Sequence, residues 1–168
     1  MNRVRLVPAI VLSAVLAIAV ALSCAATALA QAPMSYGPTI TAETAKRLAV
    51  PAIAEAKKNN WQMAVAIVDP SGDLVYFEKM DDTQVGSTQI AIDKARSAAR
   101  FKRPTKTFQD GLAAGGAGLR LLALNGAVPV EGGVPLVQNG KIVGAIGCSG
   151  GTSEQDGLCA TAGANALK

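Results

Sequence analysis

Residues 147–151 (Gly-Cys-Ser-Gly-Gly) match the G-x-S-x-G pattern that carries the nucleophile of many serine hydrolases, and they lie between an expected strand and an expected helix. A serine nucleophile needs a neighbouring base that accepts its proton, and the chain contains no histidine. Nothing in the sequence places a lysine beside Ser149 to act instead. We therefore interpret these glycines as a bend between a strand and a helix.

The same bend could present the backbone N–H groups of residues 150–153 at the start of the following helix, where the helix dipole favours an anion. Residues 131–133 (Glu-Gly-Gly) form a second flexible segment. Two interpretations stay open for these segments. They are either sites for a carboxylate or phosphate group, or plain turns.

A basic stretch runs from the middle of an expected helix into the loop that follows it. It contains Arg96, Arg100, Lys102, Arg103 and Lys106, with Thr105 and Thr107 among them. Such a stretch is most often a solvated helix face. However, arginine suits bidentate contacts with carboxylates, and a glycine joint follows at residues 115–118, so the stretch is also a candidate site for an acidic ligand.

The acidic and sulfur-containing residues indicate little chemistry. We interpret Asp81-Asp82, and the two aspartates that flank the turn at residues 70–72, as solvated loop acids. Cys148 and Cys159 either form one disulfide or are small buried residues, and the sequence leaves both possibilities open. A metal site on two cysteines needs further ligands, and without histidine we do not expect one.

The N-terminus has the three parts of a secretory signal peptide: Arg3 and Arg5, a long apolar run, and a small-residue cleavage site at residues 28–30. We predict a signal peptide over residues 1–30 and a periplasmic or secreted protein; a membrane anchor or lipidation at Cys24 are alternatives. Removal of the two arginines lowers the formal net charge from +4 to +2. We therefore expect no nucleic-acid binding, and no membrane association after cleavage.

The remaining pattern predicts an α+β domain over residues 40–168 behind an unstructured, flexible lead-in at residues 31–39. Apolar spacing, caps and turn residues predict the elements of this domain. The first half contains a helix from Thr41 that Pro51 kinks or restarts, strands at 63–68 and 73–80 around a turn, and a helix at 87–101 capped by Ser87. The second half contains a short helix or loop at 105–114, an apolar segment at 119–124, strands at 134–138 and 142–146 joined by Asn139-Gly140, and a helix capped by Thr152 and Gln155. Strands that are joined by tight turns must be antiparallel.

Taken together, several short segments resemble the GlcG/HbpS family of haem-binding and haem-degrading-type domains, which includes the C-terminal domain of PduO proteins. The matching segments are Val68-Asp69-Pro70-Ser71-Gly72, Lys79-Met80-Asp81, Lys94-Ala95-Arg96-Ser97-Ala98-Ala99, Arg103-Pro104-Thr105, Gly132-Gly133-Val134-Pro135-Leu136, Val143-Gly144-Ala145-Ile146-Gly147, Ser149-Gly150-Gly151 and Gln155-Asp156. Each segment alone is weak, and their order and spacing make the resemblance specific. It covers residues 40–167.

The resemblance implies a profilin-like fold with an antiparallel sheet of about five strands flanked by helices, a homo-oligomer, and haem as ligand. Carried onto this chain, the ligand region comprises Arg96, Arg103, Thr105 and Lys106, with Gly132 and Gly133 nearby. The absence of histidine departs from family members that ligate iron through imidazole. Iron would then need Thr105, a tyrosine, a methionine or a cysteine, or the haem would be held by its propionates and by stacking.

The leading hypothesis is an exported, oligomeric binding protein for haem or a similar acidic tetrapyrrole. Two other classes of function remain open. One is an enzyme that degrades haem or acts on a small organic acid, and the other is a sensory or structural module that binds a protein partner.

Overall fold

Strand β5 is the centre of the sheet, because it forms hydrogen bonds along both of its edges. β4 pairs with one edge of β5. β2 (antiparallel) and β1 (parallel) share the other edge, and β3 pairs with the free side of β2. The strands are β1 (Ser35–Tyr36), β2 (Ala64–Val68), β3 (Leu74–Lys79), β4 (Gly133–Gln138) and β5 (Lys141–Ser149). The computed structural model describes residues 34–167, so the predicted signal peptide and Cys24 lie outside the described residues.

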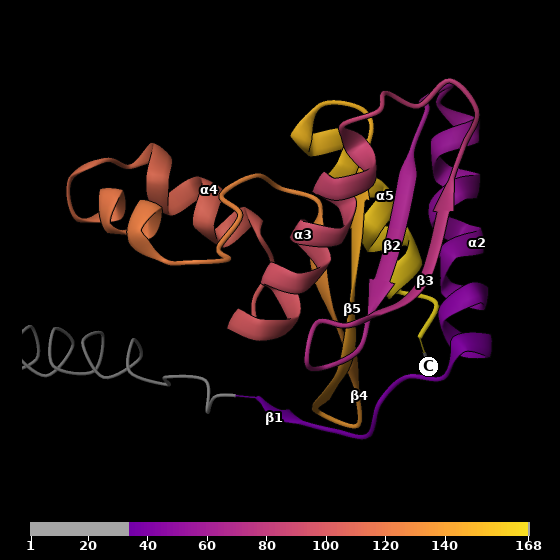
Figure 1. Cartoon of the computed structure of the whole chain (residues 1–168), viewed down its shortest axis with the longest axis horizontal. Coiled ribbons are helices and arrows are strands. Elements are labelled where there is room, and N and C mark those ends of the chain that lie inside the picture. Colours follow the sequence, from indigo (N-terminus) through magenta and orange to yellow (C-terminus); the bar gives the residue numbers. More distant parts are fainter. Residues whose placement is uncertain (1–33, 168) are drawn as a thin grey trace, which may run out of the picture. The chain divides into compact units, whose positions relative to one another are not determined.

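Helices cover both faces of this sheet (Figure 1). The apolar sides of α2 (Ala42–Lys58) and α5 (Ser153–Ala164) form a core with one face, and the alanines of α3 (Ser87–Phe101) form a second core with the other. The prediction of an α+β fold with a five-stranded sheet is confirmed, and all strand pairs are antiparallel as predicted except β1 with β5, which is parallel. Pro51 lies within α2, which continues past it as one helix. No helix between residues 34 and 167 has the length and apolar character needed to cross a bilayer.

The turns and caps of the C-terminal half follow the sequence closely. Asn139 and Gly140 have φ angles of 51° and 72°, as the two central residues of a type I′ hairpin turn require. The Thr152 hydroxyl accepts the Gln155 N–H while the Gln155 side chain accepts the Thr152 N–H, which completes the predicted capping box. These local signals fix where β4 ends and where β5 and α5 begin.

Helix α3 lies unusually close to the sheet. Its buried residues include Ala91, Ala95, Ala98 and Ala99, and Gly147 of β5 lies opposite them. A Cβ atom added at Gly147 would overlap the carbonyl oxygen of Ala91. The small alanine side chains therefore allow a close approach, and the glycine on the strand contributes as much as the helix does.

Two details differ from the prediction, and a third segment gains a defined structure. Part of the lead-in is structured, because β1 pairs with β5 and the Tyr36 hydroxyl donates to the carbonyls of Ala99 and Arg100 at 3.1 and 3.2 Å. Ser87 does not cap α3: it is the first helical residue, and its buried hydroxyl accepts hydrogen bonds from Gln84 and Ser149. The apolar segment at 119–124 falls largely within a 3₁₀ helix, η2 (Gly116–Ala123), which has no buried residue.

Helix η2 packs against α4 (Lys106–Ala113), and together they form an arm that extends away from the sheet (Figure 1). The short segment at 105–114 is thus a helix rather than a loop. Phe108 is the buried residue of α4, and its ring lies edge-on to Phe101 with 5.3 Å between the ring centres. This contact anchors the base of the arm to the end of α3.

Candidate functional site

Thr105 and Gly133 hold the start of the arm against the sheet through a pair of reciprocal hydrogen bonds. The Thr105 N–H donates to the Gly133 carbonyl at 2.9 Å, and the Gly133 N–H donates to the Thr105 hydroxyl at 2.9 Å. Both residues are buried. Since a buried backbone N–H needs a partner, the side chain of Thr105 fixes the position of β4 relative to the basic stretch.

We predict that Thr105→Val lowers the free energy of unfolding by about 1–3 kcal/mol, because it leaves the Gly133 N–H buried without an acceptor. Thr107→Val is the matched control, since Thr107 lies two residues further along the chain and is exposed. Urea denaturation followed by circular dichroism measures both. Equal losses in the two variants would contradict the role assigned to the Thr105 hydroxyl.

Lys106 and Arg103 lie next to this contact and reach the surface. The Lys106 ammonium is 2.8 Å from Asp110 and 3.9 Å from Glu131. The hydrogen bond to Asp110 raises the pKa of Lys106, so this side chain stays charged. Arg103 donates from Nε to the Phe101 carbonyl at 3.0 Å, and its guanidinium lies 5.7 Å from the centre of the Phe108 ring. Both cations are exposed, and each already has a partner within the chain.

Arg96 has a different environment. Its Nε donates to the Gly72 carbonyl at 3.0 Å, and Arg100 donates to the Ser71 carbonyl at 2.8 Å, so these two arginines hold the β2–β3 turn against α3. The structure therefore groups the predicted residues around the start of α4 and places Arg96 at the turn. The residues at the start of α4 are Arg103, Thr105, Lys106, Gly132 and Gly133.

Gly132 lies against a buried ion pair that the sequence analysis did not identify. The Lys94 ammonium is 2.6 Å from Asp156 Oδ2 and 3.3 Å from the Cys148 carbonyl, and only 1% and 4% of the two side chains are exposed. A Cβ atom added at Gly132, where φ is 126°, would lie 2.9 Å from Lys94 Nζ. Burial raises the pKa of Asp156, although its contacts with Lys94 oppose this shift. The sequence did contain a signal for this pair, because Lys94 is a lysine at helical spacing on the otherwise apolar face of α3.

The start of α5 is occupied by acceptors of the chain itself. Asp156 Oδ1 accepts the Gly151 N–H at 3.0 Å, and the Gln155 side chain accepts the Thr152 N–H at 2.9 Å. Of the two interpretations left open for residues 150–153, the structure therefore favours a plain turn over an anion site. Ser149 is buried with its hydroxyl directed at Ser87, which agrees with the interpretation that it is no nucleophile.

The two cysteines are unbonded, buried thiols. Desolvation raises the pKa of Cys148 well above its usual value and raises the pKa of Cys159 to about 12. Both remain protonated near neutral pH and are poor nucleophiles and metal ligands. Of the two alternatives for these cysteines, the structure shows small buried residues and no disulfide. Within residues 34–167, no group of three or more acidic or sulfur ligands could hold a metal ion.

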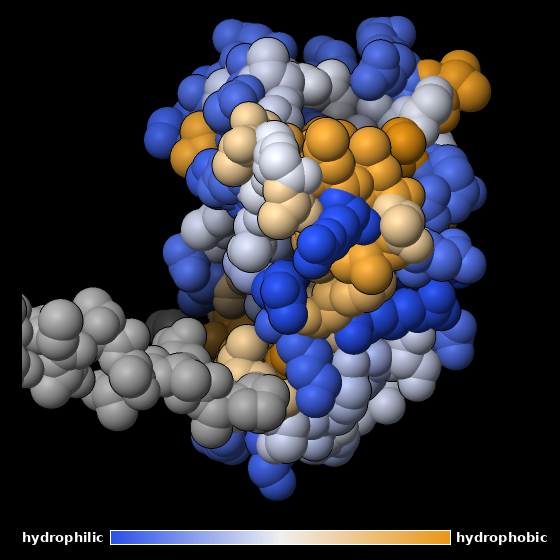
Figure 2. Space-filling view, turned by 90° about the vertical axis from the view of Figure 1, so that its left-hand side faces the viewer, coloured by the Kyte–Doolittle hydropathy of each residue, from blue (hydrophilic) through white to orange (hydrophobic). Residues whose placement is uncertain are grey.

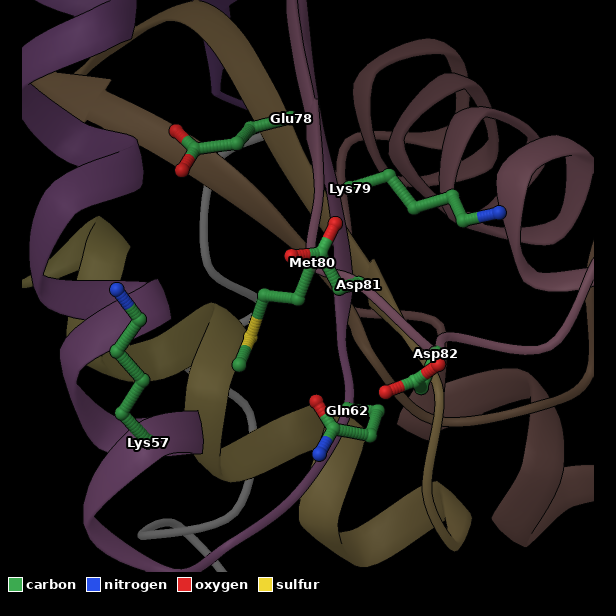
Figure 3. A pocket seen from close by; sticks show the side chains of 7 residues that line it. All are labelled: Lys57, Gln62, Glu78, Lys79, Met80, Asp81 and Asp82. Carbon is green, nitrogen blue, oxygen red and sulfur yellow. The ribbon is translucent and has the colours of Figure 1, made fainter.

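A pocket of about 420 Å³ lies where the end of α2 meets the end of β3 (Figure 3). Glu78 and Met80 point toward the side of Lys57, whereas Lys79 points to the opposite side. Residues of both charge signs line the pocket: Lys57, Gln62, Glu78, Lys79, Met80, Asp81 and Asp82. Asp81 and Asp82 thus lie on a polar surface, as expected of loop acids, and such a polar lining does not suit a large apolar ring.

The family described as "Haem degrading protein HbpS-like" has a model that matches residues 40–165. The chain belongs to this HbpS-like family. The match spans nearly all of the described residues. It confirms the family that the ordered short segments indicated.

Two relatives and one solved structure illustrate how similar this HbpS-like domain is to known proteins. It is 37% identical over 124 residues to an uncharacterized 15.0 kDa protein in the dhaT-dhaS intergenic region of Citrobacter freundii, covering 73% of this chain and 87% of that protein. It is 38% identical over 95 residues to protein GlcG of Escherichia coli K12, covering 56% of this chain and 69% of GlcG. The crystal structure of a PduOC–haem complex matches with a TM-score of 0.69 and 26% identity, covering 77% of this chain and 96% of PduOC.

Proposed function

We propose that this HbpS-like domain binds haem or a similar acidic tetrapyrrole. The observation that carries the proposal is the likeness to PduOC, which was crystallised with haem and is matched over nearly its whole length. The family description also refers to haem. The chain itself supplies exposed cations next to an apolar arm, and these fit a ring with an apolar face and two carboxylates.

The cations of the chain suit the propionates of haem. The chain cannot supply an axial imidazole to the iron, because it has no histidine. Arg96, Arg103, Thr105, Lys106, Gly132 and Gly133 remain the proposed ligand region. Within it, Arg103 and Lys106 are exposed and could contact a propionate directly. Thr105 and Gly133 are buried and bonded to each other, so their role would be to position the two cations. When bound, the haem would supply any redox chemistry.

We further propose that the domain is exported by its signal peptide and acts as a homo-oligomer in the periplasm or outside the cell. The sequence pattern of residues 1–30 supports export, and the resemblance to the family supports the oligomer. N-terminal sequencing of protein recovered from outside the cytoplasm tests the first statement, with Gln31 expected as the first residue. Sedimentation equilibrium tests the second.

Titration of the protein with hemin, followed by Soret absorbance, tests the binding function. We predict saturable binding that weakens about tenfold or more when Arg96, Arg103 and Lys106 are all replaced by alanine, because Arg103 and Lys106 would each lose a charge-assisted pair with a propionate. Lys58, exposed at the end of α2, provides the control in Lys58→Ala. Unchanged affinity in the triple variant would remove these three residues from the site.

Haem degradation is a second candidate, because the family description names it. Incubation of the hemin complex with a reductant in air distinguishes it from binding alone. Loss of the Soret band at a rate proportional to protein concentration, and abolished by prior heat denaturation, would favour the enzyme. An unchanged band would favour a binding protein.

A further inference from the structure

Glycines bring the two helices of the arm into close contact. A Cβ atom added at Gly118 of η2 would overlap the carbonyl oxygen of Gly111 in α4, and one added at Gly111 would lie 2.9 Å from a Leu121 methyl group. The two helices therefore touch backbone to backbone. Gly115 and Gly116 have φ angles of 67° and 52°, which allow the reversal between the helices. Most leucine side chains of η2 are not needed for this contact and face outward.

Two of these leucines, together with two exposed apolar residues that follow η2, form a surface here named the leucine patch. It consists of Leu119, Leu122, Leu124 and Val130, which are 56%, 68%, 43% and 40% exposed. Figure 2 faces the side from which the arm extends in Figure 1, and it shows hydrophobic side chains gathered over the upper and central part of this face, with strongly hydrophilic ones among them. An exposed apolar cluster of this kind, bordered by polar groups, is typical of a surface that binds a ligand, a membrane or another protein.

Arg120 lies within the sequence of the leucine patch and has a free guanidinium group. It is exposed, and it makes no hydrogen bond or ion pair within residues 34–167. The three arginines of the basic stretch differ, since Arg96, Arg100 and Arg103 each donate to a backbone carbonyl. Arg120 therefore adds an unpaired positive charge to an apolar surface, and an amphiphilic anion complements both properties.

We propose that the leucine patch and Arg120 seat the porphyrin ring, with the ring lying on the leucines and one propionate paired with Arg120. This inference rests on the proposed function and assigns its apolar contact surface. Lys106 begins α4, so it stands at the base of the same arm. The haem carboxylates complement the positive charge of Arg120. A second copy of the leucine patch would not complement this charge.

A two-fold contact between two copies would place the leucine patch on itself. The patch contains no carboxylate, and Asp110, the acid of α4, is already bonded to Lys106. Self-pairing would therefore bury Arg120 without an acidic partner from the patch, which is costly. A porphyrin provides both the apolar surface and the carboxylate.

None of Leu119, Arg120, Leu122, Leu124 and Val130 has a side chain that ligates iron. The seat would therefore recognise the ring and its carboxylates and not the metal. Iron-free protoporphyrin IX is expected to bind with an affinity within about threefold of that of hemin. Similar affinities for the two ligands would distinguish a surface that binds the ring from a site that depends on axial ligation of the iron.

The test measures the dissociation constants of hemin, by Soret absorbance, and of protoporphyrin IX, by fluorescence, for the full chain and four variants. Arg120→Gln and Leu119→Ser/Leu122→Ser are each expected to weaken both ligands by about tenfold or more, since one removes the charge pair and the other removes apolar contact. Arg47→Gln and Val85→Ser are the controls. They change an exposed arginine and a valine that is 84% exposed, both outside the arm, and should change affinity less than twofold.

The outcomes separate the two proposals. If the wild-type protein binds neither ligand, the proposed function fails and this inference with it. If both arm variants bind hemin as the wild type does, the function stands and the seat on the arm is refuted. Binding of hemin without protoporphyrin IX would likewise refute it, since iron would then be a contact. Arm variants that dissociate an oligomer while keeping full affinity would show that the patch joins subunits.

Discussion

Replacement of Lys94 by methionine is expected to destabilise the fold by about 3–5 kcal/mol at neutral pH, because it leaves the carboxylate of Asp156 buried without its cation. The pair joins the middle of α3 to the first turn of α5, and the Cys148 carbonyl of β5 shares the same ammonium. One substitution therefore affects both helical layers and the central strand. Thermal or urea unfolding, followed by far-UV circular dichroism, measures the loss.

The pH dependence of this loss identifies its cause. Burial already raises the pKa of Asp156, and removal of Lys94 takes away its opposing effect, so the pKa rises further. An acid whose pKa is higher in the folded state binds its proton more tightly when folded, so the deficit is full above that pKa. It shrinks as the pH falls toward the ordinary aspartate value.

The double variant Lys94→Met/Asp156→Asn is the control for the pair. It buries no charge and keeps an oxygen that can accept the Gly151 N–H. We expect it to recover at least half of the stability that Lys94→Met loses. A double variant as unstable as the single one, with no dependence on pH, would show that packing of the lysine stem and not its charge is important.

Gly147→Ala is the second change for which we expect a large effect, a loss of about 3 kcal/mol. The new methyl group would overlap the Ala91 carbonyl oxygen and approach the backbone nitrogen of Ala95, so α3 would have to move away from the sheet. The backbone of a helix cannot rotate aside as a long side chain can. Urea unfolding measures the loss.

Gly86→Ala is the matched control for this prediction. Gly86 precedes α3, has a helical φ of −61°, and has open space where the Cβ atom would lie. Its substitution should change the free energy of unfolding by no more than about 0.5 kcal/mol. Similar losses in the two variants would mean that close packing of α3 on β5 is not what requires glycine at residue 147.

The features that sequence analysis predicted well depend on neighbours in the chain. The Asn139-Gly140 turn and the Thr152 capping box each involve residues within three positions of one another, so their chemistry is readable from a short window. The bounds of α3 agree for the same reason, since helical periodicity defines the helix and Pro104 follows shortly after its end.

The features that were missed depend on partners far apart in the sequence. β1 pairs in parallel with β5, more than a hundred residues later, and two residues carry no periodicity. The partner of Lys94 is 62 residues away. Arg96 and Lys106 lie in one basic stretch of the sequence, yet the path of the chain around Pro104 separates their contacts. A local pattern predicts how residues fold and not which distant group they meet.

We propose that this domain, which has no histidine, holds haem through cations and an apolar surface. This proposal is tested most directly by incubating the protein with excess hemin, passing the mixture through a desalting column, and recording the absorbance of the protein fraction. We predict that Soret absorbance elutes with the protein at a fixed ratio of haem to chain. Protein that elutes colourless, with all of the hemin retained on the column, would contradict it.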